Sequence, residues 1–145
     1  MKYNTTMEPH TPYSILIADD DDEDRDLFDE IFRHDDRFRL LGIVESGAEV
    51  LHEVSRKNHV PDVLLVDMYM PAFTGVDIVK ALEEMHAAPI TYKFIISTTN
   101  NIAENEPVLH SPYIIFLKKP ASREEIHALP GLIVEHMQQR FSQVS

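Results

Sequence analysis

The 145-residue chain contains no cysteine, which excludes disulfide bonds, thiolate metal sites and a cysteine nucleophile. It has no apolar run long enough to span a membrane. Its first residues lack the apolar centre of a signal peptide. We therefore expect a cytoplasmic protein without membrane insertion. Residues 1–12 are expected to be a disordered lead-in, and residues 13–145 to be one domain.

Basic residues are also scarce. The chain has 13 Lys and Arg against 25 Asp and Glu, which gives a formal net charge of −12. A field of this sign repels phosphate and argues against direct binding to nucleic acid or to an anionic membrane. The negative charge favours binding of a divalent cation or of a basic protein surface. The eight histidines are scattered and lack the paired spacing of a metal site.

The chain does contain an alternation of two kinds of apolar segment. Short runs rich in Ile, Val and Leu are typical of strands buried on both faces. Apolar residues at helical spacing lie between them and predict helices over about residues 23–33, after 46–47 and after Gly75. The alternation predicts an α/β fold, a doubly wound five-stranded parallel sheet of flavodoxin-like order 2-1-3-4-5 with helices on both faces. The predicted strands are residues 15–18, 40–44, 63–66, 94–96 and 114–117.

The helical pattern weakens in the last third of the chain. Residues 100–112 contain Pro107 and Pro112 and few apolar side chains, which predicts at best a short, irregular fourth helix. The last helix is expected to be broken into a short segment over residues 123–129 and a second segment that begins at Pro130. Proline suits the first position of a helix because its missing N–H is not needed there.

An acidic cluster follows the first predicted strand. Seven of the eight residues from Asp19 to Asp26 are acidic. Like charges this close raise one another's pKa unless some face water or a cation lies among them. Asp19 and Asp20 stand at the carboxyl end of the strand, where open α/β sheets bind ligands. Residues 21–26 are expected to begin the first helix in solvent, because negative charge in a first turn suits the helix dipole.

The other predicted parallel strands bring further polar residues to the same edge of the sheet. These are Asp67, then Ser97, then Lys119 followed by Pro120. Mg²⁺ binds a few carboxylate oxygens and keeps its other positions for water and phosphate. A carboxylate can also act as a nucleophile and become an aspartyl-phosphate, while a metal ion and a lysine neutralise charge on the transferring group. The pattern therefore predicts a magnesium and phosphoryl site.

Four segments in this order resemble the response-regulator receiver family of two-component signalling; they are residues 17–20, 65–75, 95–98 and 117–120. The resemblance implies a flavodoxin-like fold and a site that binds Mg²⁺ or Mn²⁺.

By the same resemblance, Asp67 is the phosphoacceptor and a metal ligand, and Asp20 is a direct metal ligand. Asp19 would assist the metal through water, and Tyr69 would offer its backbone carbonyl to it.

The resemblance also assigns roles after phosphoryl transfer. Ser97 would bond a phosphoryl oxygen, and Lys119 would pair with it across a cis Lys119–Pro120 peptide bond. Phe116 stands where the family carries a switch aromatic that acts together with the hydroxyl residue. The side chains of Tyr69 and Thr99 would flank the route of the attacking water, and the bulk of Tyr69 would slow hydrolysis.

These features predict a single-domain response regulator, with residues 13–145 as its receiver domain. It would accept a phosphoryl group on Asp67 from a sensor histidine kinase or a phosphotransfer protein, and pass the signal on through contacts with a downstream protein. It would be a monomer or a weak homodimer. Such a protein is not a conventional enzyme, although it catalyses its own phosphorylation and dephosphorylation. The alternative is a receiver-like interaction module that is not phosphorylated, an interpretation favoured only by the irregular segment at 100–112.

Two other classes of site fit the sequence less well. Asp19, Asp21, Glu23 and Glu30 match positions one, three, five and twelve of an EF-hand loop, but Asp24 stands where that loop needs glycine. A haloacid-dehalogenase-like phosphatase carries a second acid two residues after its nucleophile, and that position is a tyrosine here.

Overall fold

A five-stranded parallel sheet of order β2-β1-β3-β4-β5 organises the protein, in a computed structural model that describes residues 11–56, 60–85, 92–98 and 111–144. Every neighbouring pair of strands is parallel. The five apolar runs form the five strands predicted from the sequence, in the predicted order. The strands are β1 (Tyr13–Ala18), β2 (Phe38–Val44), β3 (Val63–Asp67), β4 (Tyr92–Ser97) and β5 (Ile114–Lys118).

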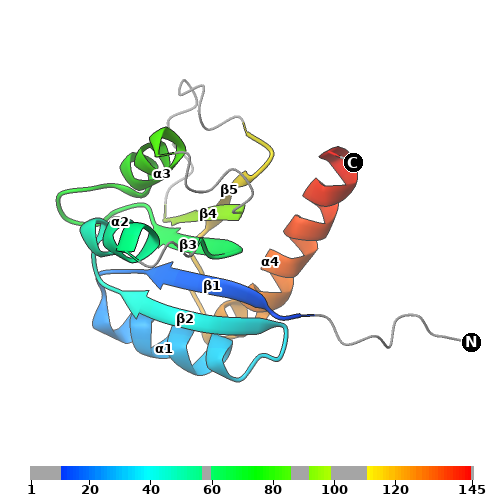
Figure 1. Cartoon of the computed structure of the whole chain (residues 1–145). Helices are drawn as coiled ribbons and strands as arrows, with labels where there is room; N and C mark the ends of the chain where they lie inside the picture. Colours follow the sequence, from blue (N-terminus) through cyan, green and yellow to red (C-terminus); the bar gives the residue numbers. More distant parts are fainter. Residues whose placement is uncertain (1–10, 57–59, 86–91, 99–110, 145) are drawn as a thin grey trace, which may run out of the picture.

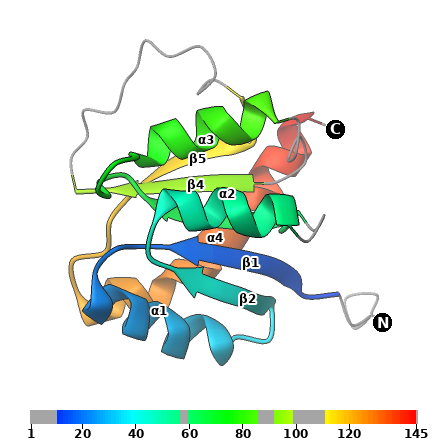
Figure 2. The same cartoon turned by 60° about the vertical axis from the view of Figure 1, so that its left-hand side comes forward.

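Four helices in the described ranges cover the two faces of this sheet: α1 (Asp22–Arg33), α2 (Gly47–Arg56), α3 (Gly75–Glu84) and α4 (Arg123–Val144). Figures 1 and 2 show α2 and α3 together on one face and α1 and α4 on the other. Short connections from strand to helix place the beginnings of α1, α2 and α3 at the same edge as the carboxyl ends of the strands. That edge is where ligands bind in open α/β sheets.

The core has two halves because successive side chains of a strand point to opposite faces. On the α2–α3 face, Leu64 and Ile95 pack with Val50 of α2 and Val79 of α3. On the α1–α4 face, a separate cluster includes Leu65 and Phe94 from the strands, Phe28 and Phe32 from α1, and Ile133 from α4. The central strands are therefore buried on both sides, and the ends of β1 and β3 are held by a packed scaffold.

The C-terminal helix corrects one prediction. α4 runs without interruption from Arg123 to Val144 with Pro130 inside it, so the predicted break at this proline is wrong. Proline removes one backbone hydrogen bond within a helix. Leu129, Ile133 and Met137 nevertheless recur at a spacing of four, and all three are buried against the sheet. Their packing holds one helix where local sequence preference favours two.

Two predictions fall on parts of the chain that are not described. Residues 1–10 of the expected disordered lead-in lie outside the described ranges, as do residues 100–110 of the expected irregular fourth helix. Among the helices that are described, none is both long enough and apolar enough to cross a membrane.

Candidate functional site

Polar residues lie at the carboxyl ends of four of the five strands, at one edge of the sheet, as the sequence predicts. Asp19 follows β1, Asp67 is the last residue of β3, Ser97 is the last residue of β4, and Lys119 follows β5. The backbone N–H of Lys119 donates to the carbonyl oxygen of Ser97 at 2.8 Å, which keeps the end of β5 beside the end of β4. Ser97 is buried at this edge.

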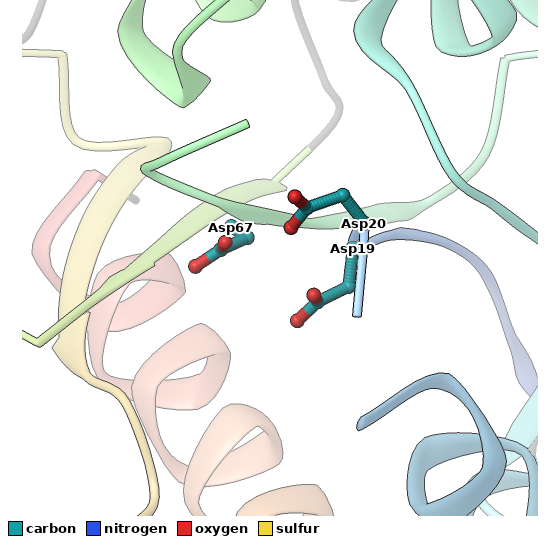
Figure 3. Close-up of side chains that lie close together, drawn as sticks. All are labelled: Asp19, Asp20 and Asp67. Atoms are coloured by element: carbon teal, nitrogen blue, oxygen red, sulfur yellow. The ribbon is translucent and has the colours of Figure 1, made fainter. Parts of the chain in front are cut away.

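Three carboxylates converge there. Each of Asp19, Asp20 and Asp67 offers an oxygen, and these oxygens lie within 4.8 Å of one another. Figure 3 shows Asp19 and Asp20, from the end of β1, beside Asp67. Asp19 and Asp67 are buried, with 0% and 5% of their surface exposed, whereas Asp20 is exposed. The cluster therefore has two acids inside the fold and one that faces solvent.

The ammonium group of Lys119 partly balances this charge. Its Nζ lies 3.2 Å from Asp19 Oδ2 and 3.5 Å from Asp67 Oδ1. It also lies 2.8 Å from Oδ2 of Asp24, a residue of α1. Burial alone would lower the pKa of Lys119, but the hydrogen bond to Asp24 and the charges of Asp19 and Asp67 outweigh burial and hold this pKa above its usual range.

The two buried acids hold protons more tightly than ordinary aspartates. Burial raises the pKa of Asp67 to about 6, and the charges of Asp19 and Asp20 add to the increase while Lys119 opposes it. Burial likewise raises the pKa of Asp19, against the backbone hydrogen bond from Asp21 and the charge of Lys119. An ionised pair of acids is therefore unfavourable here without a further cation.

The same residues fit a divalent metal ion. Asp19 Oδ2 is buried and accepts no hydrogen bond from the part of the chain that the structure describes; its close contact is the ion pair with Lys119. A buried carboxylate oxygen that has one ammonium group as its close partner is still costly to keep ionised. Carboxylate oxygens are the ligands preferred by Mg²⁺ and Mn²⁺. A cation held by Asp19, Asp20 and Asp67 would satisfy this oxygen and relieve the repulsion among the three acids.

The rest of the acidic run begins α1, as predicted. Asp21 caps the helix, because its side chain accepts a hydrogen bond of 2.9 Å from the backbone N–H of Asp24. The backbone N–H of Asp21 donates to Asp19 Oδ1 at 3.0 Å, and Arg25 Nη1 donates to the Asp19 carbonyl at 3.0 Å. These bonds fix the turn that aims Asp19 into the site.

A close backbone approach holds the loop after β3. The N–H of Gly75 donates to the carbonyl of Met68 at 2.9 Å. A Cβ atom at Gly75 would lie 3.0 Å from the Asp67 carbonyl oxygen and 3.2 Å from Met68 Cα, so a side chain would press on the backbone that carries Asp67. Thr74 closes the loop with a capping box to Asp77 at the start of α3.

The remaining predicted residues have mixed outcomes. Tyr69 is 49% exposed in the loop after β3, and Phe116 is partly buried against the cluster on the α2–α3 face. Thr99 lies outside the described residues. The predicted cis bond between Lys119 and Pro120 is wrong, because no peptide bond in the described ranges is cis. The trans form of a bond to proline is favoured by about 0.5–1 kcal/mol, and sequence alone does not show the packing that would reverse this preference.

One contact of the site was not predicted. The sequence pattern places Asp24 in the solvated start of α1, yet Asp24 makes the shortest of the three ion pairs of Lys119. In the sequence, the only indication of this contact is the position at which α1 begins. With Asp21 as the cap, Asp24 is the third residue of the helix, in the turn that lies next to the end of β1.

Comparisons with known proteins find a family model and several relatives that match this chain. Residues 15–129 match the family described as "Response regulator receiver domain". The chain is 27% identical over 107 residues to protein-glutamate methylesterase/protein-glutamine glutaminase 1 of Syntrophus aciditrophicus (strain SB), a match that covers 74% of this chain and 30% of that protein. It is 31% identical over 87 residues to the transcriptional regulatory protein YdfI of Bacillus subtilis (strain 168), covering 60% of this chain and 38% of YdfI. The chain thus spans about a third of the length of these relatives.

Solved structures share the fold. The response regulator domain of Thermotoga maritima CheB superposes with a TM-score of 0.68 at 24% identity, covering 90% of this chain and 97% of that one. A CheY-like receiver domain from Methylobacillus flagellatus superposes with a TM-score of 0.66 at 21% identity, covering 85% and 99%.

Proposed function

Because the chain belongs to the response-regulator receiver domain family of two-component signalling, we propose that it accepts a phosphoryl group on Asp67 from a sensor histidine kinase or a phosphotransfer protein. The observation that supports this most strongly is the convergence of Asp19, Asp20 and Asp67 with the ammonium of Lys119 at one edge of the sheet. The reaction would depend on Mg²⁺, which Asp19, Asp20, Asp67 and the backbone carbonyl of Tyr69 would hold.

The chemistry assigns a role to each of these side chains. A carboxylate oxygen of Asp67 attacks phosphorus, a P–O bond forms, and the bond from phosphorus to the donor histidine nitrogen breaks. Asp67 must be ionised to attack, and a pKa of about 6 leaves most of it ionised at neutral pH. A Mg²⁺ ion, when bound by these acids, would supply positive charge to balance the transferring phosphoryl group. Lys119 pairs with a phosphoryl oxygen once transfer is complete.

Phosphorylation then changes the protein around the new group. Ser97 donates its hydroxyl to a phosphoryl oxygen, and Phe116 on the next strand changes its rotamer in response. This shifts the population of the protein toward an active arrangement. The signal then leaves the receiver domain through contacts with a downstream protein in the cytoplasm. The receiver domain acts as a monomer or a weak homodimer.

A phosphoryl mimic tests this proposal. Beryllofluoride added with Mg²⁺ should bind to the wild-type protein, observed by ¹⁹F NMR as a bound fluoride signal, and should not bind to Asp67→Asn. Binding that needs both Mg²⁺ and Asp67 supports the proposal. A wild-type protein that does not respond at all would favour the alternative, an interaction module that signals without phosphate.

Magnesium should stabilise the folded protein through the three acids. A ligand present at a hundredfold excess over its Kd stabilises the folded state by about 2.7 kcal/mol, so adding MgCl₂ to protein in EDTA should raise the melting temperature measured by calorimetry. Asp20→Asn should lose most of this increase, because it removes an exposed ligand without disturbing the core. Asp36→Asn, which removes an exposed acid at the opposite edge of the sheet, is the matched control. Equal increases for the two variants would argue against Asp20 as a ligand.

The exposed ring of Tyr69 should slow loss of the phosphoryl group. Tyr69 lies two residues after Asp67 in the loop that follows β3, and 49% of the residue is exposed to solvent. Tyr69→Ala should hydrolyse the aspartyl-phosphate several times faster, measured as the decay of labelled protein after the donor is removed. Tyr69→Phe keeps the ring and should decay like the wild type. An unchanged rate in Tyr69→Ala would show that the ring does not restrict the attacking water.

A further inference from the structure

The ammonium of Lys119 is shared unequally among three carboxylates. Its Nζ lies closest to Asp24 Oδ2, at 2.8 Å, then to Asp19 Oδ2, at 3.2 Å, and farthest from Asp67 Oδ1, at 3.5 Å. The contact with Asp67, the proposed phosphoacceptor, is at the outer limit of a hydrogen bond. The strongest single partner of this lysine therefore lies on α1, outside the group of three acids that fits a metal ion.

The ion pair between Asp24 and Lys119 lies in a partly buried environment, which strengthens it. The side chain of Lys119 is 17% exposed and that of Asp24 is 27% exposed, so the pair is largely removed from water. Partly buried, charge-assisted hydrogen bonds are stronger than exposed ion pairs. The backbone N–H of Asp24 is held by the capping side chain of Asp21, which fixes the turn that presents the Asp24 carboxylate.

Asp24 also differs from the other two partners in what it binds besides Lys119. Asp19 and Asp67 belong to the group of acids that fits a metal ion, and their attraction for Lys119 falls when they hold a divalent cation. Asp24 does not belong to that group, so its attraction for the ammonium persists. A phosphoryl group on Asp67 must then compete with Asp24 for Lys119.

We propose that Asp24 is a positioning residue that holds the Lys119 ammonium on the α1 side of the site and limits how strongly Lys119 binds a phosphoryl group on Asp67. This inference rests on the proposed phosphorylation of Asp67. It adds a residue that sets the balance between the unphosphorylated and the phosphorylated protein. Removing the Asp24 charge releases the lysine toward Asp67, and so favours the phosphorylated arrangement.

The test is the affinity for beryllofluoride at saturating Mg²⁺, measured by isothermal titration calorimetry. Asp24→Asn should bind this phosphoryl mimic about three- to tenfold more tightly than the wild type, the range expected when one partly buried ion pair no longer competes. Asp24→Glu keeps the charge and should bind like the wild type. Glu23→Gln removes the same charge from the same turn, where Glu23 is exposed and has no ion pair within the described ranges, and it should also bind like the wild type.

A positioning role and a purely structural role of Asp24 predict opposite changes in the affinity for beryllofluoride. If Asp24 only supports the fold of the site, its replacement weakens binding and lowers the melting temperature, whereas the inference requires tighter binding. Unchanged or weaker binding by Asp24→Asn overturns the inference, and so does an equal gain in Glu23→Gln, which would indicate a general effect of charge. Wild-type protein that binds no beryllofluoride overturns the proposed phosphorylation itself, a result distinguishable from either of these.

Discussion

Replacement of Asp67 with asparagine should reduce phosphoryl acceptance to background. An amide oxygen is a poor nucleophile and cannot form the acyl phosphate, so no other change in the protein is needed to stop the reaction. Asparagine has nearly the same shape as aspartate, and the buried position at the end of β3 should accept it without loss of the fold. The measurement is transfer of labelled phosphate from acetyl phosphate, or from a phosphorylated histidine kinase, in the presence of Mg²⁺.

A matched control makes this result specific. Asp36→Asn removes an acid from the surface at the opposite edge of the sheet and should be labelled like the wild type. Normal labelling of Asp67→Asn would mean that another residue accepts the phosphoryl group, and that the carboxylate cluster has a different role.

Asp67→Asn should also make the metal-free protein more stable at neutral pH. Burial raises the pKa of Asp67 from 3.8 to about 6 in the folded protein, and the neighbouring Asp19 and Asp20 charges add to the increase. The ionised form is therefore less favourable in the folded state than in the unfolded state. Asp67→Asn removes this cost while Lys119 keeps Asp19 and Asp24 as partners. At about 1.4 kcal/mol per unit of pKa, the gain in the free energy of unfolding is up to about 3 kcal/mol.

The pH dependence of this gain has a definite sign. Between pH 3.8 and about 6 the folded wild-type protein binds more protons at Asp67 than the unfolded chain does, so its stability falls as pH rises through this window. The asparagine variant lacks this titration. The difference between variant and wild type should therefore be near zero below about pH 4, grow across the window and stay constant above it.

Urea denaturation in EDTA at a series of pH values measures this difference directly. Asp36→Asn should show no such growing advantage over the wild type. If Asp67→Asn is less stable than the wild type at neutral pH, Asp67 contributes favourable contacts to the fold. In that case the burial of ionised Asp67 does not destabilise the folded protein.

The strands and the main site residues could be predicted from the sequence because each depends on a local pattern. Continuous apolar runs mark the strands, and all five runs form strands of the sheet, although β2 at its edge is only partly buried. The residues that directly follow those runs are then brought together by the parallel topology alone. Asp19, Asp67 and Lys119 needed no knowledge of side-chain contacts to be placed at one edge.

The errors concern features that tertiary packing decides. Pro130 has a strong local preference for a helix start, but Leu129 and Ile133 on the same helix face bury against the sheet and keep the helix continuous. The isomer of the bond before Pro120 likewise depends on its surroundings. The contact of Asp24 with Lys119 joins α1 to the end of β5, and no spacing within either segment encodes a pair of this kind.

The most direct test of phosphoryl acceptance at Asp67 is to locate the phosphoryl group. The protein is treated with acetyl phosphate and Mg²⁺, the acyl phosphate is reduced with borohydride, and the peptides are analysed by mass spectrometry. Reduction converts a phosphorylated aspartate to homoserine. The site predicts one modified peptide, with homoserine at position 67, that is absent when Mg²⁺ is replaced by EDTA. Modification at another residue, or none at all in protein shown to be folded, would contradict the assignment of Asp67 as the phosphoacceptor.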